Sequence, residues 1–192
     1  MEEVMAKILF ITSSWRKGSN SSCLAAHAVE GAKSNGHTVT VVDIAQLHIG
    51  PCRACMACHK NKNGRCVQHD DMTQFYPPLE EADVLIFASP VYWFNLCGQI
   101  KQFIDRCYAL AAKEMPDGKT YFSRKKIGVV LAHEGNDPFD SGGINAIRSI
   151  QDICSYTGAN FVGALYGSAN NEGEVADNAA LLKKARAYGI AL

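Results

Sequence analysis

Four cysteines lie close together in the sequence, at Cys52, Cys55, Cys58 and Cys66. Their spacing, C-x2-C-x2-C-x7-C, lets one short loop place four thiolates around a single metal centre. Ferredoxin loops hold iron–sulfur clusters with the same close spacing of the first three cysteines. Four thiolates also suit zinc, although the crowded first three fit a cubane cluster better. Free thiols packed under a loop are the alternative, because the number of ligands alone does not establish a metal site.

A second candidate site is the polar loop at residues 13–21, which reads SSWRKGSNS between a predicted strand and a predicted helix. Backbone N–H groups at a helix N-terminus, together with hydroxyls and a cation, suit a phosphate dianion. The loop lacks the G-x-G-x-x-G of a Rossmann dinucleotide site and the G-x4-G-K-[ST] of an ATP or GTP loop. An ordinary polar turn with a helix cap is the alternative.

A third candidate is the loop at residues 89–98, which reads SPVYWFNLCG after another predicted strand. Its three consecutive aromatic residues cannot all face a core, and an exposed apolar cluster usually marks a ligand or partner surface. A flat isoalloxazine ring would stack there while backbone groups bond its polar edge. Alternatively, these rings cover the end of the sheet or form a dimer contact. Residues 133–139 flank the same pocket by position, and there His133 is a candidate to bond a flavin or to donate a proton to a substrate.

Composition limits the possible partners and locations. The chain has 192 residues, a net charge of +0 and 47% hydrophobic residues, and the absence of a basic stripe argues against nucleic acid or an anionic membrane as main partner. The sequence contains no apolar stretch long enough to span a bilayer, and its acidic first residues do not resemble a signal peptide. We therefore expect a cytoplasmic protein whose eight cysteines are free, metal-bound or redox-active.

Strand and helix patterns alternate along the chain, which predicts an α/β fold. Such alternation with right-handed crossovers gives a doubly wound sandwich, here a five-stranded parallel sheet with helices on both faces. We expect a single domain over residues 1–192, with a cysteine-rich loop at 45–69, and ligands at the carboxyl ends of the strands. The predicted strands are 7–12, 38–43, 83–89, 126–132 and 159–166. The predicted helices are 21–35, 98–112, 142–157 and 175–191. A further helix is predicted to begin at residue 70 and to be interrupted by Pro77 and Pro78.

These motifs resemble those of the NAD(P)H-dependent FMN reductase and iron–sulfur flavoprotein group of flavodoxin-like proteins, over nearly the whole chain. The family's first loop usually reads G-S-P-R-x-x-G-N-T, and here its Gly and Pro are replaced, whereas its S-P-V-Y-W segment is intact at residues 89–93. The resemblance places the FMN phosphate at Ser13, Arg16, Ser19, Asn20 and Ser21. It places the flavin ring at Pro90, Val91, Tyr92, Trp93, Phe94 and Asn95, and His133 joins them by position.

The resemblance extends to the cysteine loop. Iron–sulfur members of the family carry a compact C-x2-C-x2-C run with a fourth cysteine after it, and all four cysteines of this chain match that pattern. The same run, followed by D-D-M, also occurs in relatives treated as simple flavin reductases. Two interpretations of the loop therefore remain, a native [4Fe–4S] cluster and a set of free thiols. Lys101, Asp105 and Arg106 on the predicted helix after the aromatic loop are interpreted as ordinary surface ion pairs.

The resemblance implies an FMN-dependent oxidoreductase. NADH or NADPH would pass a hydride to FMN, and reduced FMN would reduce a quinone, azo, nitro or similar acceptor without a catalytic residue from the protein. An iron–sulfur electron carrier is the first alternative, with a [4Fe–4S] cluster passing electrons between a ferredoxin-like donor and FMN. A flavin-free interaction module is the second. The resemblance also implies a homodimer or homotetramer in which a neighbouring subunit helps to close the flavin site.

Overall fold

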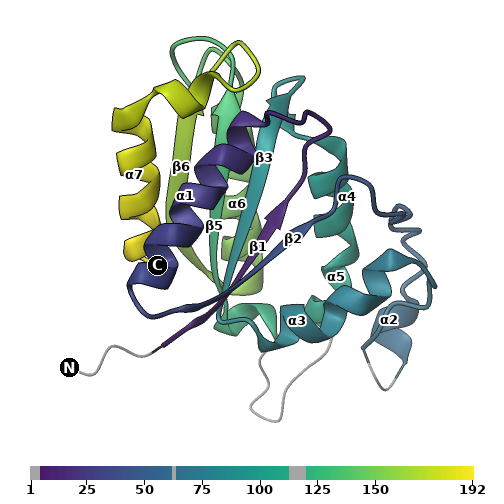
Figure 1. The fold of residues 1–192 in the computed structure, drawn as a ribbon. Helices are drawn as coiled ribbons and strands as arrows, with labels where there is room; N and C mark the ends of the chain where they lie inside the picture. Colours follow the sequence, from purple (N-terminus) through teal and green to yellow (C-terminus); the bar gives the residue numbers. More distant parts are fainter. Residues whose placement is uncertain (1–4, 62–63, 113–119) are drawn as a thin grey trace.

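The computed structural model describes residues 5–61, 64–112 and 120–192. Its centre is a sheet whose main strands are all parallel, in the order β2-β1-β3-β5-β6 (Figure 1). This order is that of the flavodoxin-like doubly wound fold, so the predicted fold class is confirmed. The strands are β1 (Lys7–Thr12), β2 (Thr38–Asp43), β3 (Val84–Tyr92), β5 (Lys126–His133) and β6 (Asn160–Ser168).

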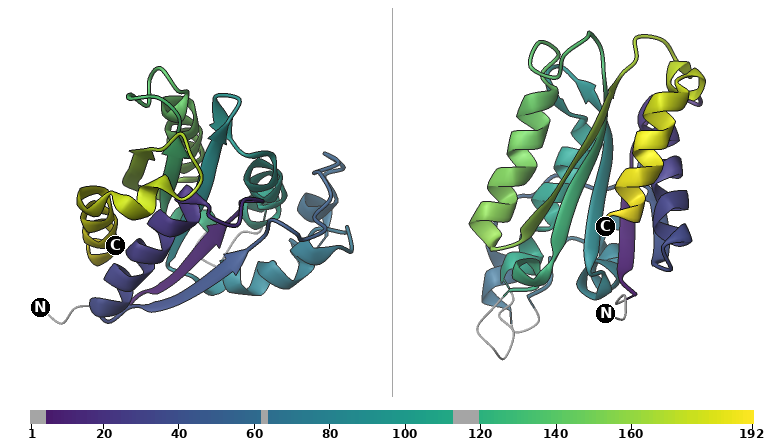
Figure 2. Two further views of the ribbon diagram at one scale, coloured as in Figure 1. Left: turned by 45° about the horizontal axis from the view of Figure 1, so that its top comes forward. Right: turned by 90° about the vertical axis from the view of Figure 1, so that its left-hand side faces the viewer.

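Helices cover both faces of the sheet, as predicted (Figure 2). On one face α1 and α7 pack over side chains such as Phe10 and Ile86, and on the other face the remaining helices pack over side chains such as Leu9 and Phe87. Each face therefore has its own apolar core. The helices are α1 (Asn20–Ser34), α2 (Ala57–Lys60), α3 (Tyr76–Glu81), α4 (Gly98–Arg106), α5 (Tyr108–Ala112), α6 (Gly143–Thr157) and α7 (Ala179–Ile190), with 3-10 helices η1 (Asp71–Phe75), η2 (Phe122–Arg124) and η3 (Glu174–Asp177).

Three predicted helices differ from the observed ones for physical reasons. The helix predicted over 175–191 is divided into η3 and α7, because Asn178 leaves the helical backbone conformation and its side chain caps α7 by accepting from the Leu181 N–H. The predicted helix over 98–112 breaks after Arg106, where the Cys107 N–H is shared between the carbonyls of Phe103 and Ile104, a bifurcated bond of the kind found at helix ends. Pro77 and Pro78 do not interrupt a helix, because α3 begins at Tyr76 and the prolines occupy its first turn. Proline is tolerated there since its missing N–H would have no intrahelical partner.

The sheet also contains a strand that the sequence did not predict. β3 continues to Tyr92, and the two-residue strand β4 (Asn95–Leu96) pairs with it antiparallel, which makes six strands rather than five. The aromatic loop is thus a hairpin that projects beyond the carboxyl end of the sheet. None of the helices in the described part of the chain has the length and apolar character needed to span a lipid bilayer.

Candidate functional site

The predicted phosphate loop lies where β1 leads into α1. Ser19 caps the helix, and its hydroxyl accepts a hydrogen bond of 3.2 Å from the Ser22 N–H. The other N–H groups of the first turn have no intrahelical partner and remain available to a ligand. The Ser13 hydroxyl is buried and makes no hydrogen bond, and a buried polar group in this state costs about 1–3 kcal/mol. A phosphate dianion would supply the acceptor that these donors lack.

A cavity of about 150 Å³ opens beside this loop. Its wall includes the exposed Arg16 and the serines at 14, 19 and 21, whereas Ser13, also predicted to hold the phosphate, does not line it. Both polar atoms of the Asn20 side chain already have partners within the protein. The amide nitrogen donates to the Asn171 carbonyl at 2.7 Å, and the amide oxygen accepts from the Val175 N–H at 3.1 Å. Asn20 therefore holds the segment after β6 against the loop and leaves only its backbone for a ligand.

The aromatic hairpin turns tightly at Trp93 and Phe94. Both residues have positive φ angles, +48° and +66°, which is the backbone of a type I′ turn, usually formed by Asn-Gly. Bulky side chains in this region are strained, and such strain is concentrated at functional sites. Trp93 is 92% exposed and Phe94 54% exposed. The turn thus presents two aromatic side chains to solvent at a conformational cost.

Three residues that the sequence reasoning did not identify hold this turn in place. The buried Ser89 hydroxyl accepts a hydrogen bond of 2.9 Å from the Cys97 N–H, which closes the base of the hairpin. The Asn145 amide donates to the Phe94 carbonyl at 3.2 Å. Gly142 lies so close that a Cβ there would be 2.4 Å from the Phe94 Cα. The glycine pair at 142–143 is visible in the sequence, but its contact with Phe94 is not.

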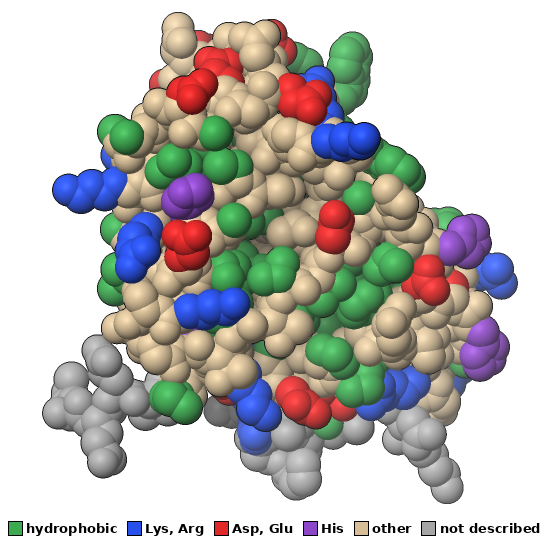
Figure 3. All heavy atoms as spheres, viewed as in Figure 1, with side chains coloured by type: hydrophobic (Ala, Val, Ile, Leu, Met, Phe, Trp, Pro, Cys, Tyr) green, Lys and Arg blue, Asp and Glu red, His purple; other side chains and the backbone are tan. Residues whose placement is uncertain are grey.

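A second cavity, of about 370 Å³, lies between the aromatic turn and the loop after β5. It shares Val91 and Glu134 with the phosphate-loop cavity, so the two are neighbours and are together called the cleft. Arg16 lines only the phosphate-loop cavity and Asp140 only the aromatic cavity, whereas Glu134 lines both. Figure 3 shows acidic side chains grouped at the top of the molecule, over the carboxyl ends of the strands. The aromatic end is therefore anionic, whereas the phosphate-loop end has one charge of each sign.

His133 lies in the wall of the phosphate-loop cavity and not in that of the aromatic cavity. Its ring is buried, with Nδ1 3.1 Å from the Glu134 carbonyl and 2.9 Å from the Ser141 hydroxyl. A carbonyl only accepts hydrogen bonds, so Nδ1 carries a hydrogen and Nε2 is the other polar atom of the ring. This position favours contact with a cofactor over proton donation to an acceptor beside the aromatic turn.

The four cysteines of the predicted metal site line one small cavity of about 30 Å³. Cys52 and Cys55 are exposed, and Cys58 and Cys66 are half-buried. A zinc ion with bonds of about 2.3 Å in a tetrahedron requires sulfurs about 3.8 Å apart. Among the described residues, no three His, Cys, Asp or Glu side chains converge in this way on a metal ion. The loop gathers the thiols around a common space without forming a ready site for one ion.

Arg106 lies beneath this loop and is buried, which corrects its interpretation as a surface residue. Its two terminal nitrogens donate to the Asp70 carboxylate at 2.5 and 3.1 Å, and Nη1 also donates to the Gly50 carbonyl at 2.9 Å. Burial alone would raise the pKa of Asp70, but the hydrogen bonds from Arg106 and the Gly50 N–H outweigh it and lower the pKa. Arg106 thus joins the segments before and after the cysteine loop.

The pKa of Cys66 is also below its usual value. Burial acts in the opposite direction, but the Gln68 N–H and the charge of Arg106 favour the thiolate more strongly. For Cys58, burial and the neighbouring Cys66 raise the pKa. The pKa values of these two neighbouring thiols are therefore shifted in opposite directions.

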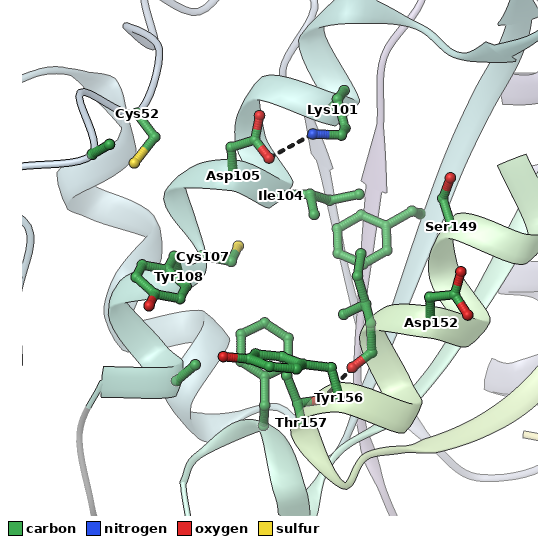
Figure 4. Close-up of a pocket in the computed structure, with 15 residues that line it drawn as sticks. Cys52, Lys101, Ile104, Asp105, Cys107, Tyr108, Ser149, Asp152, Tyr156 and Thr157 are labelled. Atoms are coloured by element: carbon green, nitrogen blue, oxygen red, sulfur yellow. Dashed lines mark hydrogen bonds and ion pairs between the residues drawn. The ribbon is translucent and has the colours of Figure 1, made fainter. Parts of the chain in front are cut away.

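A further cavity, of about 660 Å³, lies between α4, α5 and α6 (Figure 4). Lys101 and Asp105 form an ion pair of 2.6 Å at one rim, and Tyr156 lies at the opposite side. This cavity shares no lining residue with either part of the cleft, but it reaches the cysteine loop at Cys52. It is therefore a separate apolar hollow on the α4–α6 face.

Comparison with known proteins identifies the family. A family model described as NADPH-dependent FMN reductase matches residues 6–174. The chain belongs to the NADPH-dependent FMN reductase family. An iron–sulfur flavoprotein of Methanosarcina thermophila is 34% identical over 157 residues, which cover 82% of this chain and 77% of that protein. The putative NAD(P)H-dependent FMN-containing oxidoreductase YwqN of Bacillus subtilis is 31% identical over 170 residues, or 88% of each chain.

A solved structure, the NAD(P)H:quinone oxidoreductase from Methanothermobacter marburgensis, has the same fold, with a TM-score of 0.73, 18% identity and coverage of 97% of this chain and 98% of that one. As a member of the FMN reductase family, the protein is an NAD(P)H-dependent oxidoreductase with FMN as its cofactor, which sets aside the flavin-free interaction module. Its cleft has features that fit FMN, because it combines a helix N-terminus and an exposed arginine with exposed aromatic rings.

The position of Arg16 gives a first prediction about this FMN reductase. Arg16→Ala should raise the Kd for FMN about 10- to 100-fold, because a hydrogen bond to a charged group contributes about 1.5–3 kcal/mol. Riboflavin lacks the phosphate, so its Kd should stay near the wild-type value in a fluorescence titration. Lys17→Ala is the matched control, since Lys17 is an exposed neighbouring cation outside the cavity wall. Equal losses for both ligands would place Arg16 away from the phosphate.

Proposed function

We propose that the protein uses NADH or NADPH to reduce FMN held in this cleft and then reduces a quinone, azo or nitro compound, with the whole chain acting as one FMN-binding domain. The observation that carries the proposal is the cleft itself. One end has the α1 N-terminus and Arg16, and the other has the strained Trp93–Phe94 turn. When bound, FMN supplies the hydride chemistry.

The residues of the chain bind and orient in this proposal. Backbone N–H groups and Arg16 fix the phosphate, and the exposed aromatic turn covers the ring and limits the access of water. The protein need not hold or move a proton, so we assign no catalytic residue. Stacking on aromatic faces favours flat acceptors, which is why quinone, azo and nitroaromatic compounds are the proposed class.

The negative charge at the aromatic end of the cleft limits which electron acceptors are expected to react well. Glu134 and Asp140 line the cavity there, and its described lining contains no Lys or Arg. An anionic acceptor would approach two like charges, and at a solvent-exposed site each costs on the order of 1 kcal/mol. We therefore propose that neutral and cationic acceptors react faster than anionic ones, with a difference that salt reduces.

Steady-state kinetics of the FMN-loaded protein test both the proposed reaction and the proposed preference for uncharged and cationic acceptors. We expect oxidation of NADH or NADPH with a neutral naphthoquinone, and a kcat/KM about 3- to 10-fold lower with its sulfonated derivative. The double variant Glu134→Gln with Asp140→Asn should have nearly equal kcat/KM values for the neutral and the sulfonated quinone. Asp152→Asn, on the exposed face of α6, is the control and should keep the wild-type difference. A chain that binds FMN but oxidises neither nucleotide with any acceptor would contradict the proposed reaction. Equal rates for the two quinones would contradict only the charge preference.

A second candidate function is an iron–sulfur electron carrier, with a ferredoxin-like protein as the donor. The observation that favours it is the common cavity of the four cysteines, which provides the thiolate set of a [4Fe–4S] cluster. The cavity holds about 30 Å³, close to the volume of one liquid water. Residues 51–56 have no helix or strand, so we propose that this segment moves outward to admit a cluster.

Iron and sulfide analysis of protein purified without oxygen separates the two candidates. About four irons per chain, with matching sulfide, would support the electron carrier. Bound flavin without iron would contradict the electron carrier, and the FMN reductase would be the one remaining candidate function. The same preparation should be a homodimer or homotetramer by light scattering, because the exposed Trp93, Phe94 and Phe139 and the hollow beside Tyr156 offer apolar surface to a second copy. All eight cysteines are free thiols, and we propose the reducing cytoplasm as the location.

A further inference from the structure

The segment after β6, residues 169–175, forms part of the wall of the phosphate-loop cavity. Ala169 and Asn170 line that cavity together with Arg16 and the first residues of α1. The Ala169 N–H donates to the His133 carbonyl at 2.9 Å, which continues the pairing of β6 with β5 up to the cavity. This part of the wall comes from neither the phosphate loop nor the aromatic hairpin.

The side chain of Asn170 has an orientation that a neighbouring loop fixes. The Gly135 N–H donates to its Oδ1 at 3.2 Å. A peptide N–H can only donate, so the atom that faces Gly135 is the oxygen, and the amide nitrogen is on the other branch. Within the described part of the chain, Nδ2 has no hydrogen-bonding partner. Asn170 therefore brings two free N–H donors to the wall of the cavity that Arg16 also lines.

Glu174 holds the backbone of Asn170. Its Oε2 accepts the N–H of Asn170 at 2.9 Å and the N–H of Asn171 at 2.8 Å. The hydrogen bonds from Asn171 and Asn170 favour the charged form and lower the pKa of Glu174. Glu174 itself lines neither part of the cleft. An effect of Glu174 on a ligand in the cleft must therefore pass through the residues that it holds.

The same segment is also joined to the phosphate loop. The Gly18 N–H donates to the Glu172 carboxylate at 2.9 Å, and the Gly173 N–H donates to the Gly18 carbonyl at 2.9 Å. The two hydrogen bonds of the Asn20 side chain reach Asn171 and Val175. The free donors of Asn170 and of the α1 N-terminus are thus held in a fixed relation before a ligand binds, which lowers the entropic cost of binding.

We propose that Asn170 is a further FMN-binding residue whose side-chain amide donates a hydrogen bond to the phosphate, and that Glu174 is the positioning residue that holds Asn170 in place. The inference rests on the proposed function, because that function places FMN in this cleft. A phosphate suits these donors, since it is an anion with three acceptor oxygens, and the α1 N-terminus attracts an anion to the same cavity. The cavity holds only about 150 Å³, so a phosphate in it meets donors from both walls.

Titrations of the full chain with FMN and with riboflavin, followed by flavin fluorescence, test the contact. Asn170→Ala should raise the Kd for FMN about 10-fold, because it removes a hydrogen bond to a charged group. The Kd for riboflavin, which lacks the phosphate, should stay near the wild-type value. Asn170→Asp keeps the acceptor for the Gly135 N–H but places a negative charge beside the phosphate, so it should weaken FMN binding more than Asn170→Ala does. Asn136→Ala is the matched control and should match wild type, because Asn136 is exposed in the neighbouring loop and lines neither part of the cleft.

The same titrations test the positioning role of Glu174. Glu174→Ala should raise the Kd for FMN several-fold, and Glu174→Gln, which keeps an acceptor oxygen, should recover most of the affinity. The double variant Asn170→Ala with Glu174→Ala should bind FMN no more weakly than Asn170→Ala alone, because Glu174 acts through Asn170. Asp177→Ala is the control, since Asp177 is an exposed acidic residue of η3 outside the cleft. Additive losses in the double variant would overturn the positioning role.

A folded Asn170→Ala protein with the wild-type Kd for FMN would overturn the inference, and so would equal losses for FMN and riboflavin. Wild-type FMN affinity in Asn170→Asp would also overturn it, because the side chain would then serve only as the acceptor for Gly135. If Asn170→Ala does not fold, Asn170→Asp decides, since it keeps that hydrogen bond. A wild type that binds no FMN would overturn both this inference and the proposed function. A wild type whose FMN binding is weakened by Arg16→Ala but not by Asn170→Ala would overturn this inference alone.

Discussion

Replacing Gly142 by alanine is expected to raise the Kd for FMN about 10- to 100-fold. The new methyl group would overlap the Phe94 backbone, with contacts of 2.4 Å to Cα and 2.7 Å to the carbonyl oxygen. Backbone atoms cannot turn aside as a side chain can, so the aromatic turn must shift, and overpacking of this kind costs about 1–3 kcal/mol. A fluorescence titration with FMN measures the change, because the displaced turn no longer covers the ring.

Gly36→Ala is the matched control for this prediction. Gly36 has φ +84°, close to the +79° of Gly142, but no heavy atom lies within 4 Å of a Cβ at that position. Both variants place alanine in the left-handed region at a cost of about 1–2 kcal/mol. Gly36→Ala should therefore lose stability and keep the wild-type Kd for FMN. A folded Gly142→Ala protein with unchanged FMN affinity would show that the aromatic turn is not part of the flavin site.

Replacing Asp70 by alanine is expected to lower the free energy of unfolding by about 3–5 kcal/mol, because it leaves the buried Arg106 without its counter-charge. The change also removes the acceptor of the Gly50 N–H and the cap that receives the Met72 N–H. Urea unfolding at neutral pH measures the loss. Asp152→Ala is the control, since its pair with Arg148 is exposed on both sides and such pairs contribute about 0.5 kcal/mol or less.

The same residue makes stability depend on pH. The pKa of Asp70 is lowered in the folded chain, so below its unfolded value of about 3.9 the unfolded state binds more protons. The contribution of Asp70 is therefore fully present above about pH 4 and is lost as pH falls through the folded pKa. Wild type should lose this part of its stability in acid, and Asp70→Ala should not. Parallel losses in the two proteins would place the acid sensitivity at other groups.

Much of the fold could be predicted because its signals are local. The short runs of β-branched and aromatic residues at 7–12 and 38–43 match β1 and β2, and the loop serines and Gly36 fall at the two ends of α1. The aromatic loop was correctly expected to be exposed. Its hairpin was not predictable, since Trp93 and Phe94 replace the Asn-Gly that normally indicates a type I′ turn. That conformation depends on contacts with Gly142 and Asn145, which are distant in sequence.

The burial of Arg106 at the cysteine loop was also not predictable, because it depends on contacts that are distant in sequence. An arginine on an amphipathic helix near Lys101 and Asp105 has the pattern of a surface residue. Its true partner, Asp70, lies 36 residues earlier, and no periodicity connects the two. The four cysteines were visible from their spacing, but whether they converge on a metal is a property of the folded loop. Sequence patterns identified the reactive groups, while long-range contacts determine how they are held.

We propose above all that this chain holds FMN in its cleft and reduces it with NADH or NADPH. The most direct test is rapid anaerobic mixing of the FMN-loaded protein with each nucleotide while the absorbance of oxidised flavin is followed. This half-reaction needs no knowledge of the acceptor. We expect bleaching of stoichiometric bound flavin with at least one nucleotide, and restoration of the absorbance when a quinone is added. Bound flavin that neither nucleotide reduces would show that the chain is not an NAD(P)H-dependent reductase.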